Sequence, residues 1–232
     1  MAAADSQGGT RWGTHTLFFY GTLVHPAILE RVIGNPGAHL RVQNAILPAY
    51  ATWHVQGVDY PALVALSDRA PQASIAPLPE AAITASPGDA SPAPAAVPGT
   101  LVSGLTDADL RYLDLFEGDE YVRKAVDALP LNSGDSDSGT GISNALRPRD
   151  TSLADILADL SPARCAHILN ALSTSTSSVQ TVKAEAYVWC APFSMLEDRR
   201  WVFAEFAREK ARRWVGAQAD HEYTDVDRER GA

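Results

Sequence analysis

The sequence predicts an α+β fold in which a small mixed or antiparallel sheet carries a few attached helices. Three observations support this fold class. Short apolar or alternating stretches, which are typical of strands, outnumber the stretches with helical spacing. Gly, Pro, Asn or Asp residues separate many of these stretches, as turns require. Hydrophobic residues make up 46% of the 232 residues, which is enough to build the core of one domain.

The first elements are predicted to be a strand, a turn and a helix. Leu17 to Tyr20 is an apolar, aromatic run that suits a buried strand, and Gly21 breaks it into a turn. Residues 26–33 carry Ile, Leu and Val at helical spacing, with Pro26 in the first turn. Gly34 and Gly37 are expected to end this helix.

Later segments predict further strands and two more helices. The strands are expected at residues 42–46, 51–55, 63–66, 100–105 and 181–190. Thr106 is suited to cap a helix, because Asp109 follows three positions later as in the aspartate form of a capping box. Residues 195–215 predict one long amphipathic helix with Trp201, Phe206 and Trp214 in the core.

The domain organisation is predicted to be a single domain, residues 16–216, with two flexible insertions at 70–98 and 130–180. Residues 70–98 contain 7 prolines and 10 alanines and no aromatic or basic residue. Such a stretch cannot bury enough apolar area to offset its ordering entropy. Inside the second insertion, residues 152–171 have the periodicity of a small helix. Residues 1–15 and the charged tail 217–232 are expected to be flexible or frayed.

Composition excludes several classes of function. The net charge is −9 and no basic stripe is visible, which argues against nucleic-acid partners. Two cysteines cannot form a disulfide framework and favour a reducing compartment. We find no secretory signal and no run of about 20 apolar residues that could cross a bilayer. A soluble, cytoplasmic protein without membrane partners is therefore expected. Nothing in the sequence indicates an oligomeric state.

Glu117, near the end of the helix that begins after residue 106, is a candidate general base. Leu110, Leu113 and Phe116 mark one helix face. Glu117 lies four positions after Leu113 and falls on the same face. Partial burial and the negative end of the helix dipole would both raise its pKa above about 4.3, toward the range useful for a base. Gly118 can leave the helix through a left-handed conformation. Periodicity alone leaves open that Glu117 is a solvated residue at a helix end.

The turn that follows the first strand is a candidate anion-binding nest. Backbone amides exposed between a strand and a helix can hold an anionic group, and Gly21 allows a ligand to approach closely. The long glycine spacing and the lysine of a phosphate loop are missing. Taken alone, a glycine after a strand usually marks an ordinary turn.

Four short sequence motifs, which follow one another along the chain, make the assignments of the candidate base and the candidate nest specific. They are Tyr-Gly-Thr-Leu at 20–23, Leu-Pro-Ala-Tyr at 47–50, Asp-Tyr-Pro at 59–61, and Leu-x-x-Phe-Glu-Gly-Asp-Glu-Tyr-x-Arg at 113–123. As an ordered set they resemble the gamma-glutamylcyclotransferase family, and within it the small plant and fungal avirulence-induced branch. The resemblance covers residues 16–69, 98–129 and 181–215. Ala49 stands where relatives often have glycine, a change of little expected consequence.

The resemblance implies a six-stranded closed or nearly closed sheet with flanking helices, and an enzyme without metal or organic cofactor. It implies that Glu117 is the proton acceptor. In such enzymes the substrate's α-amine attacks its own γ-glutamyl carbonyl and releases 5-oxoproline together with an amine or amino acid; the intramolecular attack needs orientation rather than an enzyme nucleophile. The residues implied to bind the γ-glutamyl substrate are Tyr20, Gly21, Thr22, Leu23, Val24 and His25, with Tyr121 and Arg123 on the next strand.

The alternative to the enzyme is a non-catalytic relative that kept the nest and uses the insertions as partner surfaces.

No metal centre is expected. The six histidines show no paired metal spacing, and Cys165 with His167 would make only a partial site.

Overall fold

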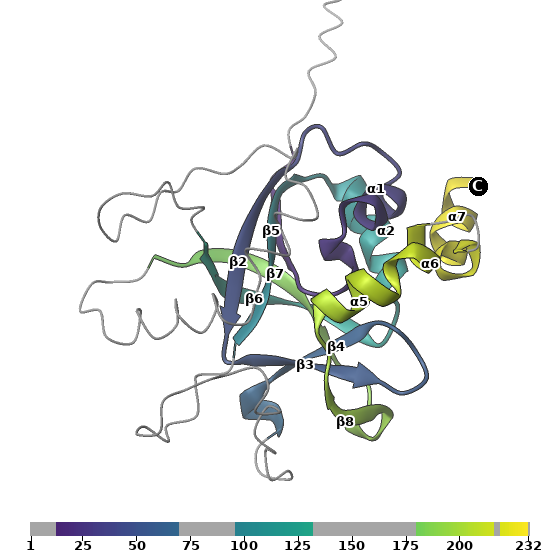
Figure 1. Ribbon diagram of the computed structural model, residues 1–232. Coiled ribbons are helices and arrows are strands. Elements are labelled where there is room, and N and C mark those ends of the chain that lie inside the picture. The colour runs from purple at the N-terminus through teal and green to yellow at the C-terminus, as the bar shows by residue number, and fades with distance from the viewer. Residues whose placement is uncertain (1–12, 70–95, 132–179, 216–218, 232) are drawn as a thin grey trace, which may run out of the picture.

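The protein folds as a five-stranded closed barrel joined to a three-stranded sheet and a group of helices (Figure 1). This computed structural model describes residues 13–69, 96–131, 180–215 and 219–231. The predicted α+β class is confirmed. The predicted single sheet of six strands is wrong in detail, because the described strands divide between two sheets with orders β1-β5-β2-β6-β7 and β4-β3-β8.

The barrel is a mixed sheet. Strand β1 runs parallel to β7, and every other pair of neighbouring barrel strands is antiparallel. Gly99 allows β1 and β5 to approach, since a Cβ atom there would lie 2.1 Å from the backbone oxygen of Phe19. The barrel strands are β1 (His15–Phe19), β2 (Arg41–Pro48), β5 (Ala96–Leu105), β6 (Tyr121–Pro130) and β7 (Val182–Trp189).

The second sheet consists of β3 (Tyr50–Val55), β4 (Pro61–Ala65) and β8 (Leu196–Arg200). The tight connection from β2 to β3 places Ala49 at φ 63°, in the left-handed region. This corrects the expectation that alanine at this position has little consequence, because its Cβ atom strains a conformation that glycine adopts freely. A 3₁₀ helix at Leu66–Arg69 follows β4, and another at Phe193–Met195 precedes β8.

The helices gather on one side of the barrel, where α1, α2, α6 and α7 lie together (Figure 1). Helix α1 (Pro26–Ile33) follows a 3₁₀ helix at Thr22–Val24 and ends at Gly34, as predicted. Helix α2 (Asp107–Glu117) has the predicted capping box: Thr106 accepts from the Asp109 amide, and the Asp109 carboxylate accepts from the Thr106 amide. The capping box and the packed face with Leu110 and Leu113 therefore fix where α2 starts and how it is rotated.

The single long helix predicted for residues 195–215 is wrong. The segment opens with β8, which pairs with β3, and continues as α5 (Phe203–Glu209) and α6 (Ala211–Val215). The amide of Trp201 bonds to the carbonyl of Thr52 at 3.2 Å, so the segment stays at the sheet before turning helical. The predicted core packing of Trp201, Phe206 and Trp214 is confirmed, since all three are buried.

The expected frayed C-terminal tail is also wrong. Residues 219–231 form a 3₁₀ helix (Asp220–Tyr223) and helix α7 (Thr224–Gly231), in which Tyr223 and Val226 are buried. Charged contacts to α1 add to this burial: the Arg31 guanidinium donates to both carboxylate oxygens of Asp227, at 2.8 and 2.6 Å. The Arg230 guanidinium donates to backbone carbonyls at the end of α1.

The structure corrects the edges of the other predicted flexible segments. Residues 96–98 begin β5 and pair with 46–48 of β2, and Pro130 ends β6 opposite Ala45. His15 begins β1. Leu131 is buried and its amide donates to the carbonyl of Asn44 at 2.7 Å. The predicted insertion residues 70–95 and 132–179, with the helix expected at 152–171, lie outside the described residues. No helix in the described ranges has the length and apolar character to cross a membrane.

Candidate active site

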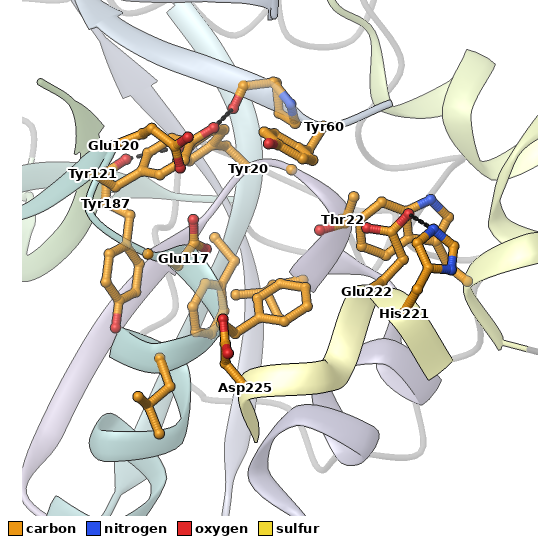
Figure 2. A pocket seen from close by; sticks show the side chains of 18 residues that line it. Tyr20, Thr22, Tyr60, Glu117, Glu120, Tyr121, Tyr187, His221, Glu222 and Asp225 are labelled. Carbon is orange, nitrogen blue, oxygen red and sulfur yellow. Dashed lines mark hydrogen bonds and ion pairs between the residues drawn. The ribbon is translucent and has the colours of Figure 1, made fainter. Parts of the chain in front are cut away.

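A cavity of about 230 Å³ opens where the end of β1 meets the C-terminus of α2 (Figure 2). Its walls come from the turn after β1, the starts of β4 and β6, the middle of β7, and the C-terminal helical segments. Two of the predicted signals meet here, because Glu117 and the residues from Tyr20 to Leu23 line the same cavity.

Glu117 is the last residue of α2, and its carboxyl group faces the cavity (Figure 2). Gly118 leaves the helix with φ 70° and ψ −168°, a conformation essentially restricted to glycine. The predicted positive φ is therefore present, although its ψ is extended rather than helical. Burial, and then the negative charge of Asp114, raise the pKa of Glu117 to about 8. Within the described part of the chain, no side chain donates a hydrogen bond to this carboxyl group.

Four tyrosines, Tyr20, Tyr60, Tyr121 and Tyr187, also line the cavity. The Tyr20 hydroxyl donates to the Tyr187 carbonyl at 2.7 Å, and the Tyr121 hydroxyl donates to the Pro61 carbonyl at 2.9 Å. Burial raises the pKa of Tyr20 and of Tyr121 well above the ordinary value, so both stay neutral. Rings with engaged hydroxyl groups surround Glu117 with a poorly solvating wall, which explains its raised pKa.

The turn after β1 lines the cavity and carries backbone amides without a backbone acceptor. The 3₁₀ helix is closed by bonds from the amides of Val24 and His25 to the carbonyls of Gly21 and Thr22. Among the described residues, the amides of Gly21, Thr22 and Leu23 donate to no backbone carbonyl. Gly21 is also sterically required, since a Cβ atom there would lie 2.8 Å from the Pro61 ring. These features fit the predicted anion nest.

Val24 and His25 do not line the cavity, contrary to the prediction for this stretch. The 3₁₀ helix turns the chain away after Leu23, and His25 becomes the N-cap of α1. The predicted site therefore ends at Leu23.

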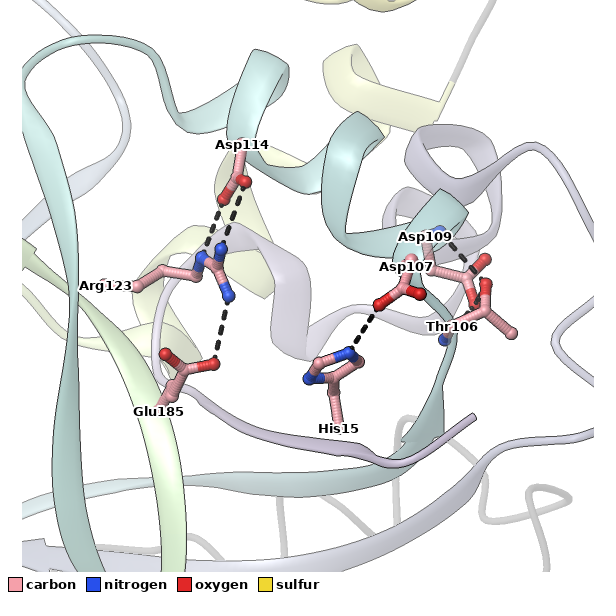
Figure 3. A network of polar contacts seen from close by, with 7 residues as sticks. All are labelled: His15, Thr106, Asp107, Asp109, Asp114, Arg123 and Glu185. Atoms are coloured by element: carbon pink, nitrogen blue, oxygen red, sulfur yellow. Dashed lines mark hydrogen bonds and ion pairs between the residues drawn. The ribbon is translucent and has the colours of Figure 1, made fainter. Parts of the chain in front are cut away.

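Arg123 does not line the cavity either, although Tyr121 on the same strand does. Its guanidinium group pairs with Asp114 and with Glu185, each at 3.0 Å (Figure 3). Two carboxylates on neighbouring elements hold the arginine beside the site rather than in it. The Tyr187 hydroxyl donates to Asp114 at 2.7 Å, so Asp114 links the arginine to the cavity wall.

Several lining residues could not be assigned from the sequence. Tyr60 lies in the Asp-Tyr-Pro phrase, and Tyr187 lies in the alternating segment that forms β7, so both had a partial signal. The sequence predicts Trp214 only as a core residue of the long helix. Three further contributors had no signal, because the charged tail carries no pattern that indicates a site. They are His221, Glu222 and Asp225. Across the described ranges, no three His, Cys, Asp or Glu side chains are placed together to hold a metal ion.

Comparison with known proteins finds one curated relative and several solved structures. No protein-family model matches the chain. Three solved structures are similar, and two of them illustrate the range. One is a solution structure from Arabidopsis thaliana, 18% identical over 93% of this chain and 82% of that one, with a TM-score of 0.44. The other is a crystal structure of a glutathione-specific gamma-glutamyl cyclotransferase from yeast, 12% identical over 75% and 68%, with a TM-score of 0.40.

The curated relative is Protein AIG2 C from Arabidopsis thaliana. It is 22% identical over 135 residues, which are 58% of this chain and 61% of that protein. The chain therefore spans about three fifths of the relative's length. The match to a protein of this name confirms the resemblance, predicted from four ordered phrases, to the avirulence-induced branch of the gamma-glutamylcyclotransferase family.

Proposed function

We propose that the protein is a gamma-glutamylcyclotransferase that acts without a metal or organic cofactor and releases 5-oxoproline from gamma-glutamyl compounds. The observation that carries the proposal is the unpaired carboxyl group of Glu117, with a pKa of about 8, in one cavity with the free amides of residues 21–23. A base of that strength is suited to take a proton near neutral pH.

In the proposed reaction, the substrate supplies both the nucleophile and the electrophile. Glu117 takes one proton from the α-ammonium group, and the freed amine attacks the γ-carbonyl carbon to close a five-membered ring. The amides of the turn donate to the oxyanion that develops on the carbonyl oxygen. When the C–N bond to the leaving group breaks, Glu117 returns its proton to the departing nitrogen, and 5-oxoproline and an amine are released.

Substrate binding prepares Glu117 for this role. In the empty cavity burial favours the protonated acid, so near pH 7 most molecules carry a proton on Glu117. The substrate's α-ammonium group brings a positive charge into the same cavity, and a nearby positive charge favours the carboxylate. The base is therefore formed beside the proton that it removes.

The test is a 5-oxoproline assay on a panel of γ-glutamyl amino acids and γ-glutamyl amines, with the α-glutamyl isomers as controls. We expect product from γ-glutamyl compounds only, because the α-isomers have no activated carbonyl at ring-closing distance from their amine. Binding of the panel without any product would contradict the proposal and favour a non-catalytic ligand-binding protein of the same fold.

The ion pair of Asp114 and Arg123 should set the pH at which the rate rises. We expect kcat/KM to rise with pH through about 8, as Glu117 of the free enzyme loses its proton. Asp114→Asn should move this limb to lower pH, because the charge of Asp114 raises the pKa of Glu117. Arg123→Gln should move it to higher pH, because Asp114 then loses its cationic partner.

Each shift is expected to be roughly 0.5–1 pH unit, the size of a screened charge interaction near a protein surface. The measurement is kcat/KM from pH 6 to about 10 for the three proteins. Asp127→Asn is the matched control, since Asp127 pairs with Lys183 on the strands away from the cavity. Shifts of the same sign in both variants would exclude this electrostatic arrangement.

A further inference from the structure

The cavity wall carries acidic groups and no strongly basic one. Among its 18 lining residues there are four carboxyl groups and no lysine or arginine. The four are Glu117, Glu120, Glu222 and Asp225. The one histidine, His221, pairs with Glu222 at 2.7 Å (Figure 2). The potential inside the cavity is therefore negative wherever the carboxyl groups are ionised.

A second hollow of about 640 Å³ continues this acidic surface outward. It shares Leu115, Gly118, Glu120 and Asp225 with the first cavity, so the two hollows are adjacent. Its further carboxyl groups are Asp114, Asp119 and Glu229, and its one basic residue is Arg228. If the γ-glutamyl part of a substrate occupies the first cavity, a long leaving group would extend into this second hollow.

Most of the outer carboxyl groups already have a partner of opposite charge. Asp114 pairs with Arg123, and Glu229 pairs with Arg111. Asp225 pairs with Arg228 at 2.9 Å.

Two carboxyl groups in the hollow stay uncompensated. Glu120 and Asp119 have no basic partner among the described residues. Both follow directly after Gly118, in the connection between α2 and β6. An uncompensated negative charge therefore stands where the two hollows adjoin, because Glu120 lines both and Glu117 lines the first.

We infer that the preferred substrate, within the proposed function, is a γ-glutamyl amine whose leaving group carries a positive charge, such as a diamine or polyamine, rather than a γ-glutamyl amino acid. A leaving amino acid would bring a carboxylate toward Glu120 and Asp119, and like charges repel. A leaving diamine would bring an ammonium group there instead. The substrate's own α-carboxylate is common to both classes and does not affect the comparison.

Three isosteric substrates test the inference, differing only in the end group of the leaving amine. They are the γ-glutamyl derivatives of 1,3-diaminopropane (cationic), butylamine (neutral) and β-alanine (anionic). We expect kcat/KM to fall in that order, with about tenfold or more between the first and the last, as one screened ion-pair interaction would give. The ratio should shrink as salt is raised from about 0.01 to 1 M, because the Debye length shortens.

Charge-neutral variants locate the effect. Glu120→Gln, and independently the exposed Asp119→Asn, should lower the ratio of kcat/KM for the cationic over the anionic substrate. Asp127→Asn removes the same charge from β6 outside both hollows, so the ratio should not change. Using two variants keeps the test valid if one of them fails to fold.

The outcomes separate the inference from the proposed function. Turnover of all three substrates at equal rates, or fastest turnover of the anionic one, overturns the inference and leaves the cyclotransferase in place. A cationic preference that neither variant reduces also overturns it, because the carboxyl groups named here would not be its source. No product from any of the three overturns the inference. The cyclotransferase is overturned as well only if the wider panel of γ-glutamyl amino acids and amines also gives no product.

Discussion

Replacing Glu117 with glutamine is expected to lower kcat/KM for γ-glutamyl substrates by about 10²–10⁴-fold, the contribution typical of a general base. Glutamine has nearly the same size and occupies the same position at the end of α2, so the cavity should keep its shape. It cannot accept a proton at neutral pH, and the α-ammonium group of the substrate then stays unreactive. The measurement is 5-oxoproline release by the variant and by the unaltered protein at pH 8.

The stability of this variant is the control for misfolding. The pKa of Glu117 is about 8 in the folded protein, against an ordinary value of 4.5. Between these pH values the folded state holds a proton that the unfolded state has lost, so the stability of the unaltered protein should decrease as pH rises from 4.5 to 8. Glu117→Gln should lack this decrease and be at least as stable at pH 8. A correctly folded variant with turnover within about twofold of the original, far short of a general base's contribution, would remove Glu117 from the mechanism.

Replacing Tyr223 with alanine is expected to lower the free energy of unfolding by about 3–5 kcal/mol, as for other large buried aromatic residues. Tyr223 is 1% exposed. Its ring stacks on Phe116 with centroids 5.7 Å apart, and the Arg31 guanidinium lies 5.0 Å from its ring centroid. Its hydroxyl donates to the carbonyl of Trp214 at 2.8 Å. The residue thus joins α1, α2 and the C-terminal segments beside the cavity.

Urea denaturation of Tyr223→Ala and Tyr223→Phe separates packing from hydrogen bonding. The phenylalanine variant keeps the ring and loses only the bond to Trp214, so about 1 kcal/mol should be lost. Phe116 precedes Glu117, so the alanine variant should also lower turnover by loosening the end of α2. A change below about 0.5 kcal/mol, the range of ordinary surface substitutions, in the alanine variant would mean that residues 219–231 are not part of the core.

The features that were predictable from the sequence depend on neighbours along the chain. The capping box of Thr106 and Asp109, the face with Leu113 and Glu117, and the glycine after Glu117 all lie within thirteen consecutive residues, 106–118. Helix periodicity and capping chemistry are local, so they survive in any tertiary context that buries this face. The place of Glu117 in a cavity follows from them once the face packs on the barrel.

The features that were missed depend on partners far apart in sequence. Residues 196–200 have no strong strand pattern, and β8 forms because β3 offers an open edge to pair with. Residues 219–231 make their contacts with distant segments: Tyr223 stacks on Phe116, and Asp227 pairs with Arg31, about 200 positions earlier. Arg123 has the spacing to share a strand face with Tyr121, and only the positions of Asp114 and Glu185 decide that it pairs outside the cavity.

The most direct measurement is a pH titration of the Glu117 carboxyl group by ¹³C NMR, with Glu117→Gln to assign its signal. A half-buried carboxyl group in the tyrosine-lined cavity, beside Asp114, should titrate with a midpoint of about 8. Adding a non-hydrolysable γ-glutamyl ligand should lower that midpoint, because the ligand's ammonium group favours the carboxylate. A midpoint near the ordinary value of 4.5 would show a solvated side chain and contradict the role of Glu117 as the base.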